Sequence, residues 1–116
     1  MEILEQNAAY VVCIKPAGIP SQGEGLDAMP ARLAAEVGGE IYPVHRLDQA
    51  VGGVMVYART KQAAAALSRA IQEGRMEKDY FAVLTKPMAE ASGTLRDLLY
   101  HDRVKNKTYV VKRKRN

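Results

Sequence analysis

Short apolar runs separated by glycine and proline recur along the chain. Residues 10–15 are rich in β-branched side chains and are followed at once by Pro16, which predicts a strand that runs into a loop ending near Gly25. A second apolar run, 54–58, follows a glycine pair, and the segment 78–84 begins with two charged residues and continues with apolar and aromatic ones. Both are predicted strands. Shorter extended pieces are expected at 41–44, 98–100 and 108–112.

The first predicted helix covers residues 28–37. Asp27 is placed to cap it, and Pro30 falls in its first turn, where proline is tolerated. The glycine pair Gly38 and Gly39 is expected to end it.

The second predicted helix covers residues 61–73, with Thr60 as its N-cap and Gly74 at its end. Its apolar residues share one face, which should pack on a sheet: Ala63, Ala64, Leu67, Ala70 and Ile71. Because helices and strands are interspersed, we predict an α+β fold with a mixed, mainly antiparallel sheet flanked by helices.

Composition limits the class of protein. The 116 residues are 47% hydrophobic and 26% charged, which is typical of one globular domain or a piece of one. The longest apolar run, residues 8–14, is far below the ~18 residues that a membrane helix needs. The first residues lack the pattern of a secretory signal, so a cytoplasmic location is expected. The single cysteine, Cys13, lies in a predicted core strand and is interpreted as a structural thiol.

The formal net charge of +4 is unevenly distributed. Residues 103–116 contain seven Lys or Arg and no acid, which leaves ten basic against thirteen acidic residues in positions 1–102. Such a basic tail is either a solvated segment or a phosphate contact. The last predicted strand runs directly into this tail, so we expect a sheet that is incomplete at the C-terminus. Its unpaired edge would allow a homodimer.

The candidate chemistry lies between residues 42 and 53. His45, Arg46 and Asp48 crowd this predicted loop, and loops held between ordered elements commonly carry catalytic groups. An aspartate carboxylate is ordinarily an anion at neutral pH and can serve as nucleophile, base or metal ligand. Arg46 suits contacts to phosphate or to nucleic-acid bases. Taken alone, Asp48 is more typical of a turn or helix cap than of a catalytic site, and His45 is more typical of a structural histidine than of a ligand or base.

Several motifs together resemble the RluA-type pseudouridine synthase family, whose members isomerise uridine to pseudouridine in RNA. His-Arg-Leu-Asp at 45–48, followed by the glycines at 52–53, resembles the signature of that family. Lys-Pro-Ala-Gly at 15–18 resembles its N-terminal motif, Lys-Asp-Tyr at 78–80 resembles its Lys-x-Tyr motif, and residues 93–107 resemble the segment that follows. The likeness covers essentially the whole chain.

The resemblance implies roles for four residues. Asp48 matches the nucleophile that attacks the target nucleotide, and Arg46 matches an arginine that contacts RNA. Tyr80 matches the tyrosine that stacks on the target base and assists removal of the C5 proton. Lys78 matches the lysine of the motif, interpreted as an organising ion-pair partner and grouped with Arg46 as an RNA-binding residue. Ribosomal or transfer RNA is the expected substrate, and no metal or organic cofactor is implied.

The chain departs from the family in one respect. The arginine motif that pairs with the catalytic aspartate in the family has no counterpart here, so residues 1–116 are interpreted as the N-terminal portion of a catalytic domain and expected to be nearly inactive alone. A non-catalytic RNA-binding fragment is therefore the alternative. A more distant one is an enzyme that uses Asp48 as a general base on a small metabolite. Metal binding by His45 with Asp48, or by His101 with Asp102, lacks a third ligand.

Overall fold

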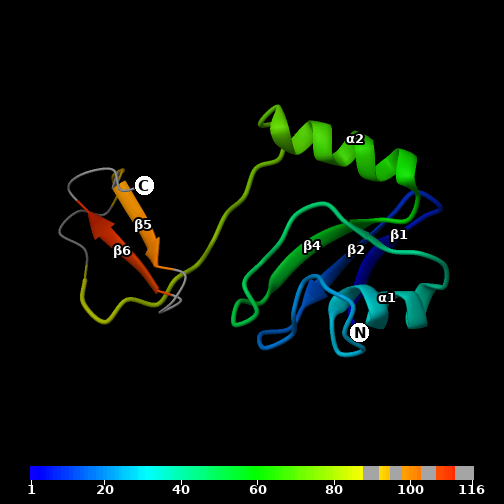
Figure 1. Ribbon diagram of the computed structural model, residues 1–116, viewed down its shortest axis with the longest axis horizontal. Helices are drawn as coiled ribbons and strands as arrows, with labels where there is room; N and C mark the ends of the chain where they lie inside the picture. The colour runs from blue at the N-terminus through cyan, green and yellow to red at the C-terminus, as the bar shows by residue number, and fades with distance from the viewer. Residues whose placement is uncertain (88–91, 95–97, 103–106, 112–116) are drawn as a thin grey trace. The chain divides into compact units, whose positions relative to one another are not determined.

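The computed structural model describes residues 1–87, 92–94, 98–102 and 107–111, and the chain divides into two units, residues 1–79 and 80–116. The first unit is a four-stranded sheet with two helices (Figure 1). The second contains a two-stranded sheet. The predicted α+β class is confirmed, and the strand pairs described are antiparallel.

The order of strands in the first sheet brings two loops to one end of it. The strands lie in the order β1, β2, β4, β3 and cover Ile3–Gln6, Tyr10–Lys15, Gly53–Ala58 and Tyr42–Pro43, respectively. In the central pair, Tyr10 lies opposite Ala58 and Lys15 lies opposite Gly53. The loop that leaves β2 and the loop that enters β4 therefore meet at the same end of the sheet.

The core lies between the central strands and helix α1, Met29–Val37. Alternate residues of β2 and β4 face it, as expected for strands with one buried side. Its fully buried members are Val11, Cys13, Met29, Leu33, Met55 and Tyr57. Burial raises the pKa of Cys13 to about 11, which keeps the thiol protonated and agrees with the structural role expected for it.

Helix α2, Lys61–Gln72, lies on the other side of the sheet from α1 in the view of Figure 1. The predicted cap is confirmed, because the Thr60 hydroxyl accepts a hydrogen bond from the Ala63 N–H at 3.0 Å. Gly74 follows the helix with a φ of 72°, a left-handed conformation that favours glycine. The predicted apolar face is half-buried and contacts β4.

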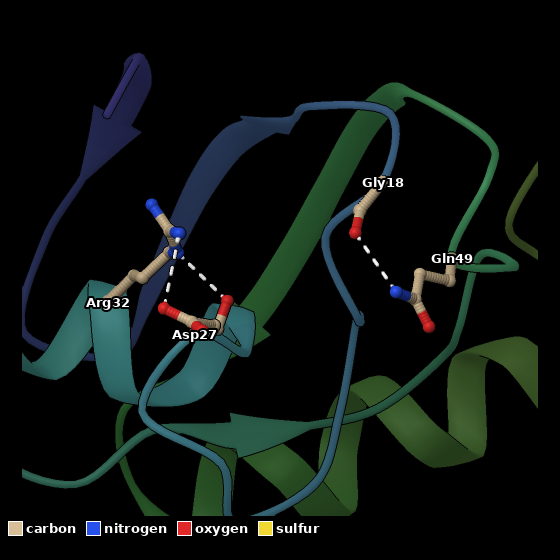
Figure 2. Close-up of polar contacts among 4 residues, drawn as sticks. All are labelled: Gly18, Asp27, Arg32 and Gln49. Carbon is tan, nitrogen blue, oxygen red and sulfur yellow. Dashed lines mark hydrogen bonds and ion pairs between the residues drawn. The ribbon is translucent and has the colours of Figure 1, made fainter.

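The predicted cap of α1 is wrong. The N-cap is Ala28, which makes no side-chain hydrogen bond, and the helix begins one residue later than expected. The N–H of Met29 instead donates to the carbonyl of Pro20 at 2.9 Å, and Pro30 has no N–H to satisfy. The free donors of the first turn are therefore reduced without a capping side chain. Asp27 pairs with Arg32 at 3.7 Å (Figure 2).

The predicted strand at residues 78–84 is also wrong. The segment is not a strand, and its large apolar side chains are exposed, Phe81 and Val83 completely. Its composition favours a strand, but a strand also needs a neighbouring backbone to pair with. Within the part of the chain that the structure describes, no strand pairs with it.

Strand β1 was not predicted from the pattern. Its residues alternate poorly, because Leu4, Glu5 and Gln6 are all exposed. It pairs with β2 through a turn in which the Asn7 side-chain oxygen accepts hydrogen bonds from the N–H groups of Ala9 and Tyr10, at 2.8 and 2.9 Å. This local side-chain bonding is typical of asparagine in turns.

The second unit contains the antiparallel pair β5, Leu98–Asp102, and β6, Lys107–Val111. The extended pieces expected at 98–100 and 108–111 are confirmed, while residues 112–116 and 103–106 of the basic tail lie outside the described residues. The last strand, β6, pairs with β5. Homodimer formation through an unpaired sheet edge is a separate question and stays a prediction. Among the described residues, no helix is long and apolar enough to cross a bilayer.

Candidate active site

Two loops pack against each other at the end of the first sheet. We call residues 16–21, which follow β2, the β2 loop, and residues 44–52, which precede β4, the Asp48 loop. Lys15 and Gly53, paired across the two strands, are where these loops begin and end. The contacts between the loops determine where Asp48 lies.

Lys15 is the residue that joins the two loops most extensively. It occupies the third inward position of β2, after Val11 and Cys13, and is completely buried. Its Nζ donates to three carbonyl oxygens, of Pro16 at 2.9 Å, Ile19 at 2.7 Å and Gln49 at 3.0 Å. Burial lowers the pKa of Lys15, whereas the three acceptors favour the charged form. All three ammonium donors are thus satisfied within the protein.

Ser21 holds the Asp48 loop at Leu47. Its buried hydroxyl donates to the Leu47 carbonyl at 2.9 Å and accepts from the Leu47 N–H at 3.3 Å. The carbonyl of Ser21 accepts a hydrogen bond from the buried Tyr57 hydroxyl, and burial raises the pKa of that phenol. The hydroxyl of Ser21 therefore bonds both backbone groups of Leu47, as a neighbouring strand would. The core side chain Tyr57 in turn fixes the backbone of Ser21.

Gln49 binds the Asp48 loop to Gly18 of the β2 loop. Its backbone oxygen accepts from the Gly18 N–H at 2.6 Å. Its side-chain amide donates to the Gly18 carbonyl at 3.1 Å, as Figure 2 shows. At Gly52 the backbones approach closely, since a Cβ there would lie 3.1 Å from the Lys15 oxygen and 3.2 Å from the Ala17 nitrogen. Only glycine fits this approach without displacing backbone.

His45 fastens the beginning of the Asp48 loop to β4. Its Nε2 accepts a hydrogen bond from the Val56 N–H at 3.1 Å. The imidazole is half-buried. Burial is the main cause that lowers the pKa of His45, and the charge of Lys78 lowers it further, while the bond to Val56 acts in the opposite direction. The ring is therefore held in its neutral form, with the proton on Nδ1.

Alternate residues of the Asp48 loop are thus fixed, at positions 45, 47 and 49. The residues between them, Arg46 and Asp48, have exposed side chains. A turn follows directly, in which the Val51 N–H donates to the Asp48 carbonyl at 2.9 Å. The loop presents a guanidinium and a carboxylate to solvent on a backbone that is held at three points.

The four residues expected to form the site are only partly brought together. Arg46 and Asp48 lie on the same loop, and Lys78, whose charge acts on His45, belongs to the same unit. Tyr80 belongs to the second unit, is exposed and does not lie on a strand, which corrects the position expected for it. The ion pair expected for Lys78 stays a prediction, since the pairs found among the described residues are Arg32 with Asp27 and Arg75 with Glu73.

The residues that position Asp48 were not identified from the sequence. Lys15 could have been suspected from the sequence, because a charged residue at an inward position of a predicted strand needs hydrogen-bond partners. Ser21 and Gln49 had none, since their partners lie 26 and 31 positions away along the chain. In the described ranges, three or more possible metal ligands do not cluster anywhere.

Comparisons with known proteins show which family the chain resembles. The chain matches the RNA pseudouridylate synthase family over residues 9–116. It is 32% identical over 89 residues to tRNA pseudouridine synthase C of Vibrio parahaemolyticus, covering 72% of this chain and 36% of that protein. It is 31% identical over 97 residues to the Vibrio cholerae protein of the same name, covering 79% and 40%, respectively.

A similar relation holds for a solved structure. The chain resembles the human RNA pseudouridylate synthase domain containing 4, with a TM-score of 0.53 and 30% identity over 64% of this chain and 30% of that one. The chain therefore belongs to the RNA pseudouridylate synthase family, and the RluA-type resemblance of its motifs is confirmed. It spans 36% to 40% of the length of the two Vibrio relatives.

Proposed function

We propose that this chain carries the nucleophile of an RNA pseudouridine synthase, and that Asp48 is that nucleophile. The observation that supports this most strongly is the Asp48 loop itself, because its neighbours are held by hydrogen bonds while the carboxylate is exposed to solvent. An enzyme must hold its reacting group to within about 1 Å, since a larger error can cost ~100-fold in rate. A backbone fastened on both sides of an exposed carboxylate meets that need.

The proposed reaction is an isomerisation, so its atoms balance without a co-reactant. Attack by the Asp48 carboxylate on the target nucleotide leads to cleavage of the bond between uracil N1 and ribose C1′. The freed uracil turns, C5 bonds to C1′, the C5 proton is lost and N1 gains a proton. The carboxylate is released unchanged. The target base must first leave its stack, which costs a few kcal/mol that contacts with the RNA offset.

Three further residues have proposed roles. Arg46, exposed two residues before Asp48, contacts the RNA near the position that the target base vacates. Tyr80 stacks on the base and assists proton removal from C5, and Lys78 contributes positive charge beside the loop. The names of the Vibrio relatives favour transfer RNA as substrate. A cytoplasmic location is proposed with it, since transfer RNA functions there.

The test follows from the chemistry, because replacement of C5–H by C5–C1′ releases the C5 hydrogen. Transfer RNA and ribosomal RNA transcripts labelled with tritium at C5 of uridine are incubated with the 116-residue chain. They are also incubated with a fusion of the chain to the part of the Vibrio parahaemolyticus relative that follows its matched region. We expect tritium release from transfer RNA with at least the fusion. Binding without release by both proteins would favour the RNA-binding module, and turnover insensitive to RNA would favour a small-metabolite enzyme.

A further inference from the structure

The edge of β4 is completed by a side chain where β3 ends. Strand β3 pairs with β4 over two residues, Tyr42 opposite Ala58 and Pro43 opposite Tyr57. Beyond Pro43 the backbone leaves the sheet, and the next N–H on this edge of β4, that of Val56, is bound by the imidazole of His45. The ring therefore acts in place of the backbone carbonyl that a longer β3 would supply.

This contact depends on the protonation state of the ring. Nε2 accepts the hydrogen bond only with a free lone pair, so the ring must be neutral. On protonation both ring nitrogens become donors, and Nε2–H would then face the Val56 N–H. The bond would be lost and two donors would be left opposed. The half-buried site makes this costly, because buried polar groups need partners.

The charge of Lys78 also favours the neutral ring. Lys78, in the segment after α2, acts on it directly and adds to the effect of burial in lowering its pKa. The part of β4 next to it, Gly53–Val56, has no titratable side chain. The other charged residues of the neighbouring elements are Arg46 and Asp48 on the loop, Lys61 and Arg69 on the exposed side of α2, and four residues of the segment that carries Lys78, namely Glu73, Arg75, Glu77 and Asp79. The titratable phenols of the adjoining strands are Tyr42 on β3 and Tyr57 on β4.

We propose that His45 is a positioning residue: its neutral imidazole holds the Asp48 loop on the edge of β4, and its protonation releases the loop. The proposal rests on the assignment of Asp48 as nucleophile for its effect on the reaction. His45 lies three residues before Asp48 and is the first of the three fixed positions of the loop. Releasing it frees the beginning of the loop from β4, so that, among the described contacts between the two loops, only those of Leu47 and Gln49 with Ser21, Gly18 and Lys15 hold Asp48.

The structural half of the test does not require activity. In the 116-residue chain, the His45 ring and the amide of Val56 are followed by NMR from pH 8 to pH 4.5. We expect both signals to change with one midpoint below the ordinary histidine value of ~6.5, and the amides of Leu47 and Asp48 to follow. In His45→Gln, whose amide oxygen can replace Nε2 without titrating in this range, the Val56 amide should stay constant. A Val56 amide that ignores the titration of His45 would overturn the proposal.

The kinetic half uses whichever of the two forms described above turns over RNA. The parent should lose kcat/KM at acid pH with the midpoint found by NMR. His45→Gln should keep the neutral-pH rate and lose that acid limb, whereas His45→Leu should be slower by about tenfold to 100-fold at every pH. His101→Gln is the matched control and should follow the parent.

The outcomes separate the two ideas. An acid limb that persists unchanged in His45→Gln, or a His45→Leu variant as fast as the parent, would overturn the positioning role. Absence of turnover in both forms of the parent would overturn the proposed function instead. The NMR titration would then still decide whether the ring holds the loop.

Discussion

Replacing Lys15 by methionine tests how firmly the two loops are joined. Lys15 is completely buried, and methionine is a flexible side chain of similar length that fills irregular core space well. The substitution therefore keeps most of the packing and removes the three N–H donors that bind the carbonyls of Pro16, Ile19 and Gln49. Any loss of stability then reports mainly on those hydrogen bonds.

The size of the effect can be worked out from the acceptors. The Gln49 oxygen keeps the N–H of Gly18 at 2.6 Å, and the Pro16 oxygen keeps the N–H of Ile19 at 3.4 Å. Among the described contacts the Ile19 oxygen loses its donor altogether, and an unsatisfied buried group costs about 1–3 kcal/mol. Weakening at the other two adds to this, while relief of burying an ammonium group offsets part of it. We expect a net loss of about 2–3 kcal/mol in the free energy of unfolding.

The assay is equilibrium unfolding in urea together with a thermal melt. A loss of this size should lower Tm by about 10–20 °C, since 1 kcal/mol shifts Tm by roughly 4–8 °C in a small domain. Lys61→Met, which changes an exposed lysine of α2, is the matched control and should stay within about 0.5 kcal/mol of the parent. A Lys15→Met variant with the stability of the control would refute the account of this residue.

Three further predictions concern single positions. Gly52→Ala should destabilise the chain and slow turnover, because the added Cβ meets backbone atoms at 3.1 and 3.2 Å. Gly25→Ala is the control and should be neutral, since its Cβ meets nothing within 4 Å. Equal melting curves for the two variants would contradict this. Arg46→Ala should weaken RNA binding and single-turnover rate in a filter-binding and rapid-quench experiment, and unchanged values would make it a structural residue. Burial raises the pKa of Cys13 from 9.0 to about 11, so the free energy of unfolding should fall as the pH rises through this range, because the thiol ionises first in the unfolded chain. Urea melts at pH 8 and pH 10.5, with Cys13→Ala as the reference, measure this fall.

Much of the fold followed from local pattern. The strand at 10–15, the strand at 54–58 and the helix capped by Thr60 were predicted because each has its own periodicity and end signals. The predictions that were wrong depended on partners elsewhere. Residues 78–84 have the composition of a strand but no described neighbouring strand. Asp27 does not cap α1, because the Pro20 carbonyl accepts the hydrogen bond of the Met29 N–H in its first turn.

The candidate site likewise has a part that the sequence predicts and a part that it does not. The position of Asp48 on a loop was predictable from the motif and its flanking glycines. The means of holding it was not, because Lys15 and Gln49 lie 34 positions apart and bind through a backbone oxygen, which every residue type possesses. Sequence pattern reports on side chains, so contacts made by the backbone become visible only in the folded chain.

Asp48→Asn tests whether Asp48 is the nucleophile. The substitution keeps the shape of the side chain and removes its nucleophilic charge, and the neighbouring hydrogen bonds of the loop are made by other residues. Pseudouridine in transfer RNA is measured by mass spectrometry beside RNA affinity, in the form of the protein that turns over, with Asp27→Asn as the control at an exposed aspartate. We expect no pseudouridine and nearly unchanged affinity for Asp48→Asn, and parental values for the control. Substantial pseudouridine formation by correctly folded Asp48→Asn protein would contradict it.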